Sequence, residues 1–167
     1  MVGPISAAVL LLLFPVASAN AEDSFLQNLA GNWTGTGAAR QSEDSAPEPI
    51  KCKIAAEIDA AKQQLDQKGR CATADRTSSI IGEIKLDPEN GRYSGHWSTR
   101  ADGRKTELEG ERIGDELHLS ASTKTAGSIG TIVLAPNGTD GYVMVMSKTP
   151  GPDGKGGESA EIHFTRR

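Results

Sequence analysis

The chain has 167 residues and a formal net charge of −4, with its charges spread along the sequence rather than gathered in a basic block. Proteins that bind nucleic acid need a positive footprint for the phosphates, so this charge pattern argues against nucleic acid as a partner. Neither of the two cysteines has a second cysteine or a histidine close by in the sequence. The local sequence therefore lacks the ligands for metal or redox chemistry, and we expect no metal site and no cofactor.

Residues 1–21 have the features of a secretory signal peptide. An apolar run at residues 7–14 is followed by small residues that end at Ala21, which is a suitable cleavage site. The run is shorter than the roughly 20 residues that a spanning helix needs, and Pro15 interrupts it. We therefore expect a bacterial periplasmic or secreted protein, with residues 22–167 as a single domain and no membrane span in the mature chain.

Short segments of alternating hydrophobicity recur after the signal segment, about every ten residues, separated by clusters of Gly, Asp, Asn and Pro. The segments predicted as strands are residues 32–39, 50–58, 62–73, 79–86, 92–99, 105–112, 116–123, 128–134, 141–147 and 158–165. Sequential hairpins without long crossovers favour an up-and-down barrel, because closure removes the exposed sheet edges. The sequence thus predicts an all-β barrel of roughly eight to ten antiparallel strands.

Cys52 and Cys71 are an even pair in a chain that we expect to be exported, which favours one disulfide. Such a bond would restrict the unfolded chain and stabilise the fold by about 3 kcal/mol.

The segment at residues 54–67 is compatible with two local structures. A turn near residues 59–61 would make it part of a hairpin that brings the two cysteines onto neighbouring strands. Alternatively, the sequence IAAEIDAAKQQLDQ has good helix formers at apolar spacing and would form a helix. The disulfide is compatible with both structures.

The first predicted strand carries a Gly-x-Trp pattern, with Gly31 and Trp33 in the sequence LAGNWTG. This start resembles the opening of lipocalins, avidins and related calycin barrels. The resemblance implies that Trp33 closes the base of the barrel, and that Arg166 or Arg167 from the last strand packs on its ring. A cation in that position is worth about 0.5 to 2 kcal/mol. The chain is also similar to small uncharacterised exported proteins of alphaproteobacteria, which share the early tryptophan, the paired cysteines and a strand like GRYSGHW.

The sequence favours a binding protein over an enzyme. It contains no Gly-x-Ser-x-Gly elbow and no recognisable metalloprotease helix. His96, His118 and His163 each have apolar neighbours in the sequence, so the imidazoles face solvent if those neighbours fill the barrel. The alternative for His163 is haem ligation, as in haem-binding nitrobindin barrels, which have a similar Gly-x-Trp-x-Gly start.

The segment GYVMVM at residues 141–146 is apolar on both faces. Tyr142, Met144 and Met146 would form an adaptable apolar wall for a small apolar ligand. Burial on both faces would follow if this hairpin faced the lumen on one side and a covering segment or a partner on the other. Ordinary core packing is the alternative explanation for these residues.

A second function comes from resemblance to the lipocalin-like inhibitor of bacterial metalloproteases, which is similar in size and has one early disulfide. That resemblance implies a free N-terminal segment, residues 22–28, that inserts into an extracytoplasmic protease. A structural protein of the cell envelope, acting through its outer surface, is a further alternative. The sequence leaves the identity of any ligand open.

Overall fold

The computed structural model describes residues 24–99, 105–125, 127–149, 157 and 159–167, so the expected signal segment lies outside the described residues. In order along the chain, the elements are α1 (Ser24–Leu29), β1 (Gly31–Arg40), β2 (Glu48–Asp59), β3 (Gln64–Ala72), β4 (Thr77–Asp87), β5 (Arg92–Thr99), β6 (Lys105–Ile113), β7 (Glu116–Thr123), β8 (Gly127–Pro136), β9 (Gly141–Lys148) and β10 (Ser159–Arg166). Each observed strand overlaps a predicted one. Within these residues, no helix has the length and apolar composition that a membrane crossing requires.

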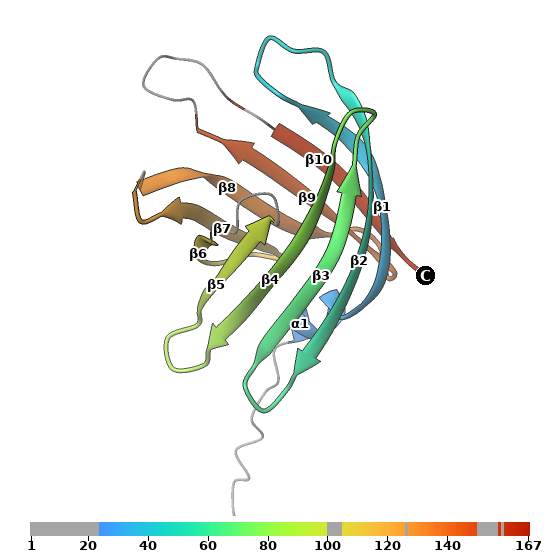
Figure 1. Cartoon of the computed structure of the whole chain (residues 1–167). Helices are drawn as coiled ribbons and strands as arrows, with labels where there is room; N and C mark the ends of the chain where they lie inside the picture. Colours follow the sequence, from blue (N-terminus) through green and yellow to red (C-terminus); the bar gives the residue numbers. More distant parts are fainter. Residues whose placement is uncertain (1–23, 100–104, 126, 150–156, 158) are drawn as a thin grey trace, which may run out of the picture.

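The strands form one closed antiparallel barrel in which consecutive strands are neighbours (Figure 1). The last strand closes the barrel by pairing with the first, in a register that runs from Trp33 opposite Arg166 to Arg40 opposite Ser159. Every strand therefore has a partner on both sides, and no edge is left for pairing with another chain. The all-β, up-and-down barrel predicted from the sequence is confirmed.

Residues 54–67, for which the sequence allowed a hairpin or a helix, form a hairpin, and the helix alternative is wrong. β2 and β3 pair antiparallel, with Cys52 opposite Cys71 and Ile58 opposite Leu65. Because β2 also pairs with β1, and β3 with β4, ladder hydrogen bonds and burial on the inner face outweigh the modest helix propensity of this segment.

Alternation along the strands separates the core from the surface. On β2, Ile50, Cys52 and Ile54 are buried, whereas Lys51 and Lys53 between them are exposed. The same period of two applies around the barrel and lines its inside with aliphatic and aromatic side chains.

The helix α1 closes one end of the barrel, at the lower end in Figure 1. Its side chains Phe25, Leu26 and Leu29 are 6%, 0% and 3% exposed, respectively. The guanidinium of Arg112, at the end of β6, lies over the Phe25 ring with Cζ 5.2 Å from the ring centroid. A helix of six residues is too short to be stable alone, so burial of this apolar face against the barrel holds it in place.

Candidate functional site

Trp33 fills the end of the barrel that α1 covers. Its side chain is 2% exposed, and its indole Nε1 donates a 2.8 Å hydrogen bond to the carbonyl oxygen of Leu29. The guanidinium of Arg166 lies over the ring, with Cζ 4.4 Å from the ring centroid. These contacts join β1, α1 and β10, and they give Trp33 a structural role at the base of the barrel.

Arg166, and not Arg167, supplies the cation over Trp33. Its Nη1 donates to the carbonyl oxygen of Ala30 at 2.7 Å, and its Nη2 donates to that of Asn28 at 3.2 Å. These carbonyls lie at the end of α1, where a helix leaves its last acceptors without intrahelical donors. Because successive side chains of a strand point to opposite faces, Arg167 cannot share this position.

Gly31 makes room for this arrangement. Its φ is +132°, a conformation that glycine adopts readily and other residues rarely do. A Cβ at this position would also collide with the guanidinium of Arg166. The Gly-x-Trp pattern therefore has a local physical reason, because the glycine admits the arginine that covers the tryptophan.

Tyr142 and Met144 lie in the packed part of the barrel, with exposed fractions of 3% and 2%. The Tyr142 ring stacks on Phe164 with centroids 4.6 Å apart, and meets Trp33 edge to face with centroids 4.9 Å apart. Burial raises the pKa of the Tyr142 phenol well above its ordinary value. Contrary to the prediction of a ligand wall, these two side chains fill the closed half of the barrel.

In the described residues, no segment of the chain covers the outer face of β9 at Val145. Val145, which points outward between Met144 and Met146, is 38% exposed. The buried side chains of this strand thus lie mainly on its inner face, which is the usual pattern for a strand in the wall of a barrel.

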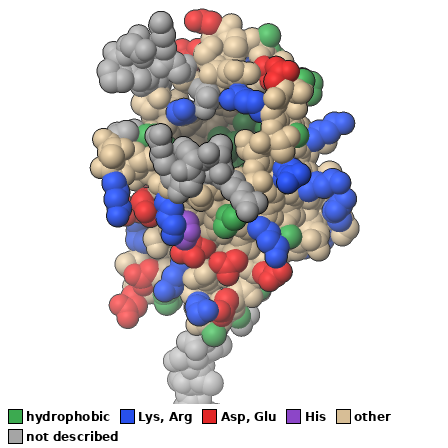
Figure 2. Space-filling model, in the orientation of Figure 1, with side chains coloured by type: hydrophobic (Ala, Val, Ile, Leu, Met, Phe, Trp, Pro, Cys, Tyr) green, Lys and Arg blue, Asp and Glu red, His purple; other side chains and the backbone are tan. Residues whose placement is uncertain are grey.

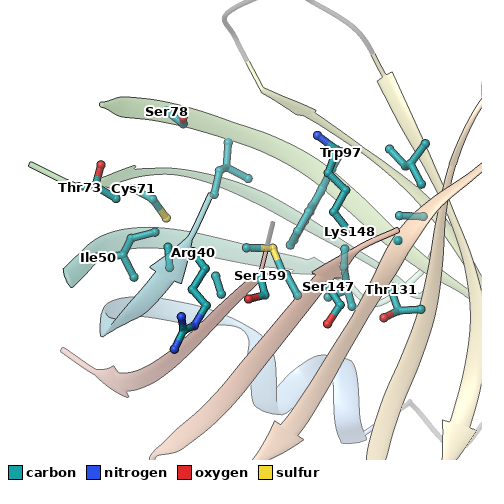
Figure 3. Close-up of a pocket in the computed structure, with 18 of the residues that line it drawn as sticks. Arg40, Ile50, Cys71, Thr73, Ser78, Trp97, Thr131, Ser147, Lys148 and Ser159 are labelled. Carbon is teal, nitrogen blue, oxygen red and sulfur yellow. The ribbon is translucent and has the colours of Figure 1, made fainter. Parts of the chain in front are cut away.

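The opposite end of the barrel holds a cavity of about 360 Å³ (Figure 3). Its apolar lining consists of Ala39, Ile50, Cys71, Ile80, Trp97, Ala121, Ile129, Ile132, Met146 and Ala160. Its polar lining among the described residues consists of Arg40, Thr73, Arg76, Ser78, Thr131, Ser147, Lys148 and Ser159, with the backbone of Gly130. Of the three residues predicted to contact a ligand, Met146 is the one that lines this cavity.

Trp97 forms a wall of the cavity that the sequence analysis did not assign to a site. It pairs with Gly82 across β4 and β5, and its ring occupies the space that a side chain at Gly82 would need. Its Nε1 is buried and has no hydrogen-bond partner among the described residues, which leaves an unpaired donor in the cavity wall. Strand alternation could have predicted this position, because Tyr93, Gly95 and Trp97 share one face of β5 and Tyr93 is buried inside the barrel.

The disulfide between Cys52 and Cys71 is present and links β2 to β3 inside the barrel. The two side chains are 2% and 7% exposed, and Cys71 lines the cavity. The predicted pairing is confirmed, and its position makes the disulfide part of the cavity wall.

The three histidines lie on the outer face of the barrel, each beside a carboxylate. The pairs are His96 with Glu83 at 3.2 Å, His118 with Glu116 at 2.8 Å and His163 with Glu161 at 2.9 Å. The His163 imidazole, considered above for haem, is thus directed away from the cavity. Within the described residues, no group of three or more His, Cys, Asp or Glu side chains is placed to hold a metal ion.

The protease-inhibitor resemblance implied that residues 22–28 are a free segment. Residues 22 and 23 lie outside the described residues, and the rest of the segment is not free. From Ser24 to Leu29 it forms α1, and the buried side chains of Phe25 and Leu26 anchor it to the barrel. Insertion into a protease cleft would require this apolar face to leave the barrel, so the structure does not support that partner.

No protein-family model matches the chain, and no curated protein matches it in sequence. Solved structures with a similar fold include Rv2717c from M. tuberculosis, with a TM-score of 0.66 and 16% identity over 88% of this chain and 98% of that chain. The S-type phycobiliprotein lyase CPES from Guillardia theta has a TM-score of 0.46 and 9% identity over 87% of this chain and 92% of that chain. The similarity to Rv2717c concerns the β-barrel fold alone. The resemblance to alphaproteobacterial exported proteins stays a prediction.

Proposed function

We propose that this chain is a non-enzymatic exported protein that binds a small apolar ligand in the open half of its barrel. The observation that carries the proposal is the cavity of about 360 Å³ with Ile80, Trp97 and Met146 in its wall. Cavities that bind small molecules are commonly about 300 to 1,000 Å³, mostly apolar, with a few polar groups.

The division of the barrel into two halves supports a binding role. Trp33 and Phe164 both pack on Tyr142 in the closed half, and none of the three lines the cavity. The disulfide at Cys71 restrains one wall. A cavity built on such a scaffold is largely formed before a ligand arrives, which lowers the entropic cost of binding.

The placement of the ionisable residues supports a role without catalysis. The imidazoles, which are the commonest general bases, lie on the outer face beside Glu83, Glu116 and Glu161. The cavity wall instead combines aliphatic and aromatic side chains with hydroxyl groups and cations. These groups are suited to holding a molecule in place.

Titration with the neutral fluorescent probe N-phenyl-1-naphthylamine tests this function. We expect saturable fluorescence enhancement with the wild-type protein, and binding at least about tenfold weaker in Met146→Glu, because the new carboxylate would be buried in the cavity wall. Val145→Glu is the matched control, since it places the same charge one residue away on the exposed outer face.

Probe binding that is equal in Met146→Glu and Val145→Glu, with both variants folded by circular dichroism, would place the probe outside the cavity and contradict the proposal. Met144→Glu is not a useful test, because that side chain belongs to the packed half of the barrel and its replacement would disturb folding.

Export is tested separately by cell fractionation of the full chain, with mass spectrometry of the mature N-terminus. We expect a periplasmic or secreted form that begins at Glu22. A cytoplasmic form that retains residues 1–21 would contradict the export proposal and leave the cavity unaffected.

A further inference from the structure

The disulfide between Cys52 and Cys71 is accessible from the inside of the barrel. Both side chains lie on the inner face, so the sheet itself separates the two sulfur atoms from the outer surface. Cys71 is the more exposed of the two and lines the cavity, whereas Cys52 is not among the lining residues. In the close-up, the side chain of Cys71 lies among those around the cavity (Figure 3). A reagent must therefore enter the open half of the barrel to reach this bond.

The space beside Cys52 is filled. Its neighbour on β1 is Gly35, and a side chain at Gly35 would collide with Phe164 and Ile162. Phe164 and Ile162 are themselves fully buried, so they occupy the inner face next to Cys52. This side of the disulfide belongs to the packed half of the barrel.

The space beside Cys71 is open. Its neighbour on β4 is Ser78, which has a small side chain, is exposed and lines the cavity. The space-filling view shows a hollow on one face of the molecule with hydrophobic side chains inside it (Figure 2). A small molecule can thus approach Cys71 from the β4 side without displacing a large side chain.

This difference decides which sulfur atom can be attacked. A thiolate displaces one sulfur of a disulfide in line, from the side opposite to the leaving sulfur. Because the bond joins β2 to β3, a thiolate that attacks Cys71 approaches over β4, where Ser78 leaves room. A thiolate that attacks Cys52 would have to approach over β1, where buried side chains fill the space. The geometry therefore makes Cys71 the attacked sulfur and Cys52 the leaving group.

We propose that Cys71 is a site of thiol–disulfide exchange with small apolar thiols that enter the cavity. The thiolate sulfur forms a bond to Cys71 Sγ, and the bond between the cysteines breaks with its electron pair going to Cys52 Sγ, which takes a proton from solvent. The product is a mixed disulfide at Cys71, with no net oxidation or reduction. A second thiol can displace the first, which leaves the protein reduced and the two thiols joined as a disulfide.

The cavity wall favours apolar thiols of low mass. Ile50 and Ile80 lie in the lining together with Cys71, so an apolar thiol loses contact with water as it reaches the bond. A folded oxidoreductase cannot enter a cavity of about 360 Å³. The inference goes beyond the proposed binding function, because it assigns a covalent modification to one residue of the wall.

The first test compares butanethiol with glutathione on the folded protein at about pH 8, where thiols are partly ionised. Acid quenching and mass spectrometry follow the loss of the disulfide. Each rate is divided by the rate of the same thiol with the protein unfolded in guanidinium chloride, which removes differences in intrinsic reactivity. We expect the corrected rate to be at least about tenfold higher for butanethiol, because glutathione is larger and charged. Equal corrected rates would assign the exchange to unfolded molecules and overturn the proposal.

The variant Ser78→Leu tests the path of approach. The larger side chain should slow exchange with butanethiol at least about tenfold, because it fills the space over β4 from which the thiolate attacks. Thr77→Leu is the matched control, since it adds the same side chain one residue away on the outer face, and it should keep the wild-type rate. Both positions are exposed, and circular dichroism checks that both variants fold. Equal rates in the two variants would rule out this path.

Peptide mass spectrometry of the acid-quenched mixed disulfide should locate the butylthio group on Cys71. A butylthio group on Cys52, or on both cysteines in equal amounts, would contradict the assignment. Saturating N-phenyl-1-naphthylamine should slow the exchange at least about threefold by occupying the cavity. An unchanged rate with the probe bound would place the exchange elsewhere and overturn the proposal.

The outcomes separate this site from the proposed binding function. A protein that fails to bind the neutral probe but shows the preference for butanethiol and the block by Ser78→Leu would keep the thiol site and lose the proposed ligand. A protein that binds the probe in the cavity but shows neither effect would keep the binding function and lose the thiol site.

Discussion

The Arg166 guanidinium lies over the ring of Trp33, with Cζ 4.4 Å from the ring centroid, and this contact joins the last strand of the barrel to the first. The same guanidinium donates hydrogen bonds to two carbonyl oxygens at the end of α1, those of Asn28 and Ala30. One side chain thus connects the closure of the barrel to the helix that covers its end.

Replacing Arg166 by alanine should lower the free energy of unfolding by about 1 to 3 kcal/mol, because it removes the contact with Trp33 and two charge-assisted hydrogen bonds. Urea denaturation measures this change. Arg167→Ala is the control, and it should change stability by less than about 0.5 kcal/mol, as is usual for an exposed position. Equal losses in the two variants would show that the position over the ring contributes nothing.

Trp33→Ala should cost about 3 to 5 kcal/mol, because the ring is almost fully enclosed and its removal leaves a cavity between α1 and the barrel. The measurement is urea denaturation followed by far-UV circular dichroism, since the substitution also removes fluorescence. A loss below about 1 kcal/mol would be incompatible with a structural role at the base of the barrel.

Converting both Cys52 and Cys71 to serine should lower the free energy of unfolding by about 3 kcal/mol, because the unfolded chain gains the freedom of an open loop. Mass spectrometry of non-reduced peptides from the wild-type protein should show the two cysteines joined. Free thiols at both positions in exported protein would contradict the structure of this wall.

Gly82→Ala should displace the Trp97 ring and destabilise the barrel by about 1 to 3 kcal/mol, because the added Cβ would overlap the indole. A double-mutant cycle with Trp97→Ala isolates this effect. When the ring is already absent, the cost of the alanine should fall to less than half. A cost that is the same in both backgrounds would assign it to the backbone of the neighbouring strand.

Stability at alkaline pH should depend on Tyr142. Burial raises the pKa of its phenol above the ordinary value of 10.0, so its contribution is fully present below about pH 10 and is lost as the pH rises further. Above pH 10 the unfolded state ionises first, and this residue should lower the free energy of unfolding by about 1.4 kcal/mol per pH unit. The difference between wild type and Tyr142→Phe across pH 9 to 11.5 measures this slope, and a difference independent of pH would contradict it.

Much of the barrel could be predicted from short-range patterns in the sequence. Alternation along residues 50–58 identifies a strand with one apolar face, because successive side chains point to opposite sides of the sheet. Turn sequences such as DPENGR mark where one strand ends and the next begins. An even pair of cysteines after an apparent signal segment suggested the disulfide. Trp33 could be assigned to the inside for the same reason of alternation.

Other features required the closed barrel, because they depend on which strands become neighbours and how far along the axis each residue lies. Arg166 reaches Trp33 because β10 closes on β1 in a register that no local pattern specifies. Met144 and Met146 share one face of β9, so alternation treats them alike, yet Met144 is buried in the closed half and Met146 lines the cavity.

The cavity is the feature furthest from anything visible in the sequence. Ile50, Ile80 and Met146, which line it, are separated by long stretches of chain and occupy no common motif. A local pattern records whether a side chain points inward or outward, but only closure of the strands into a ring brings distant strand ends to the same opening. The sequence therefore determines the strands and which of their faces is apolar, and only the packing of the closed barrel decides where a cavity remains between those faces.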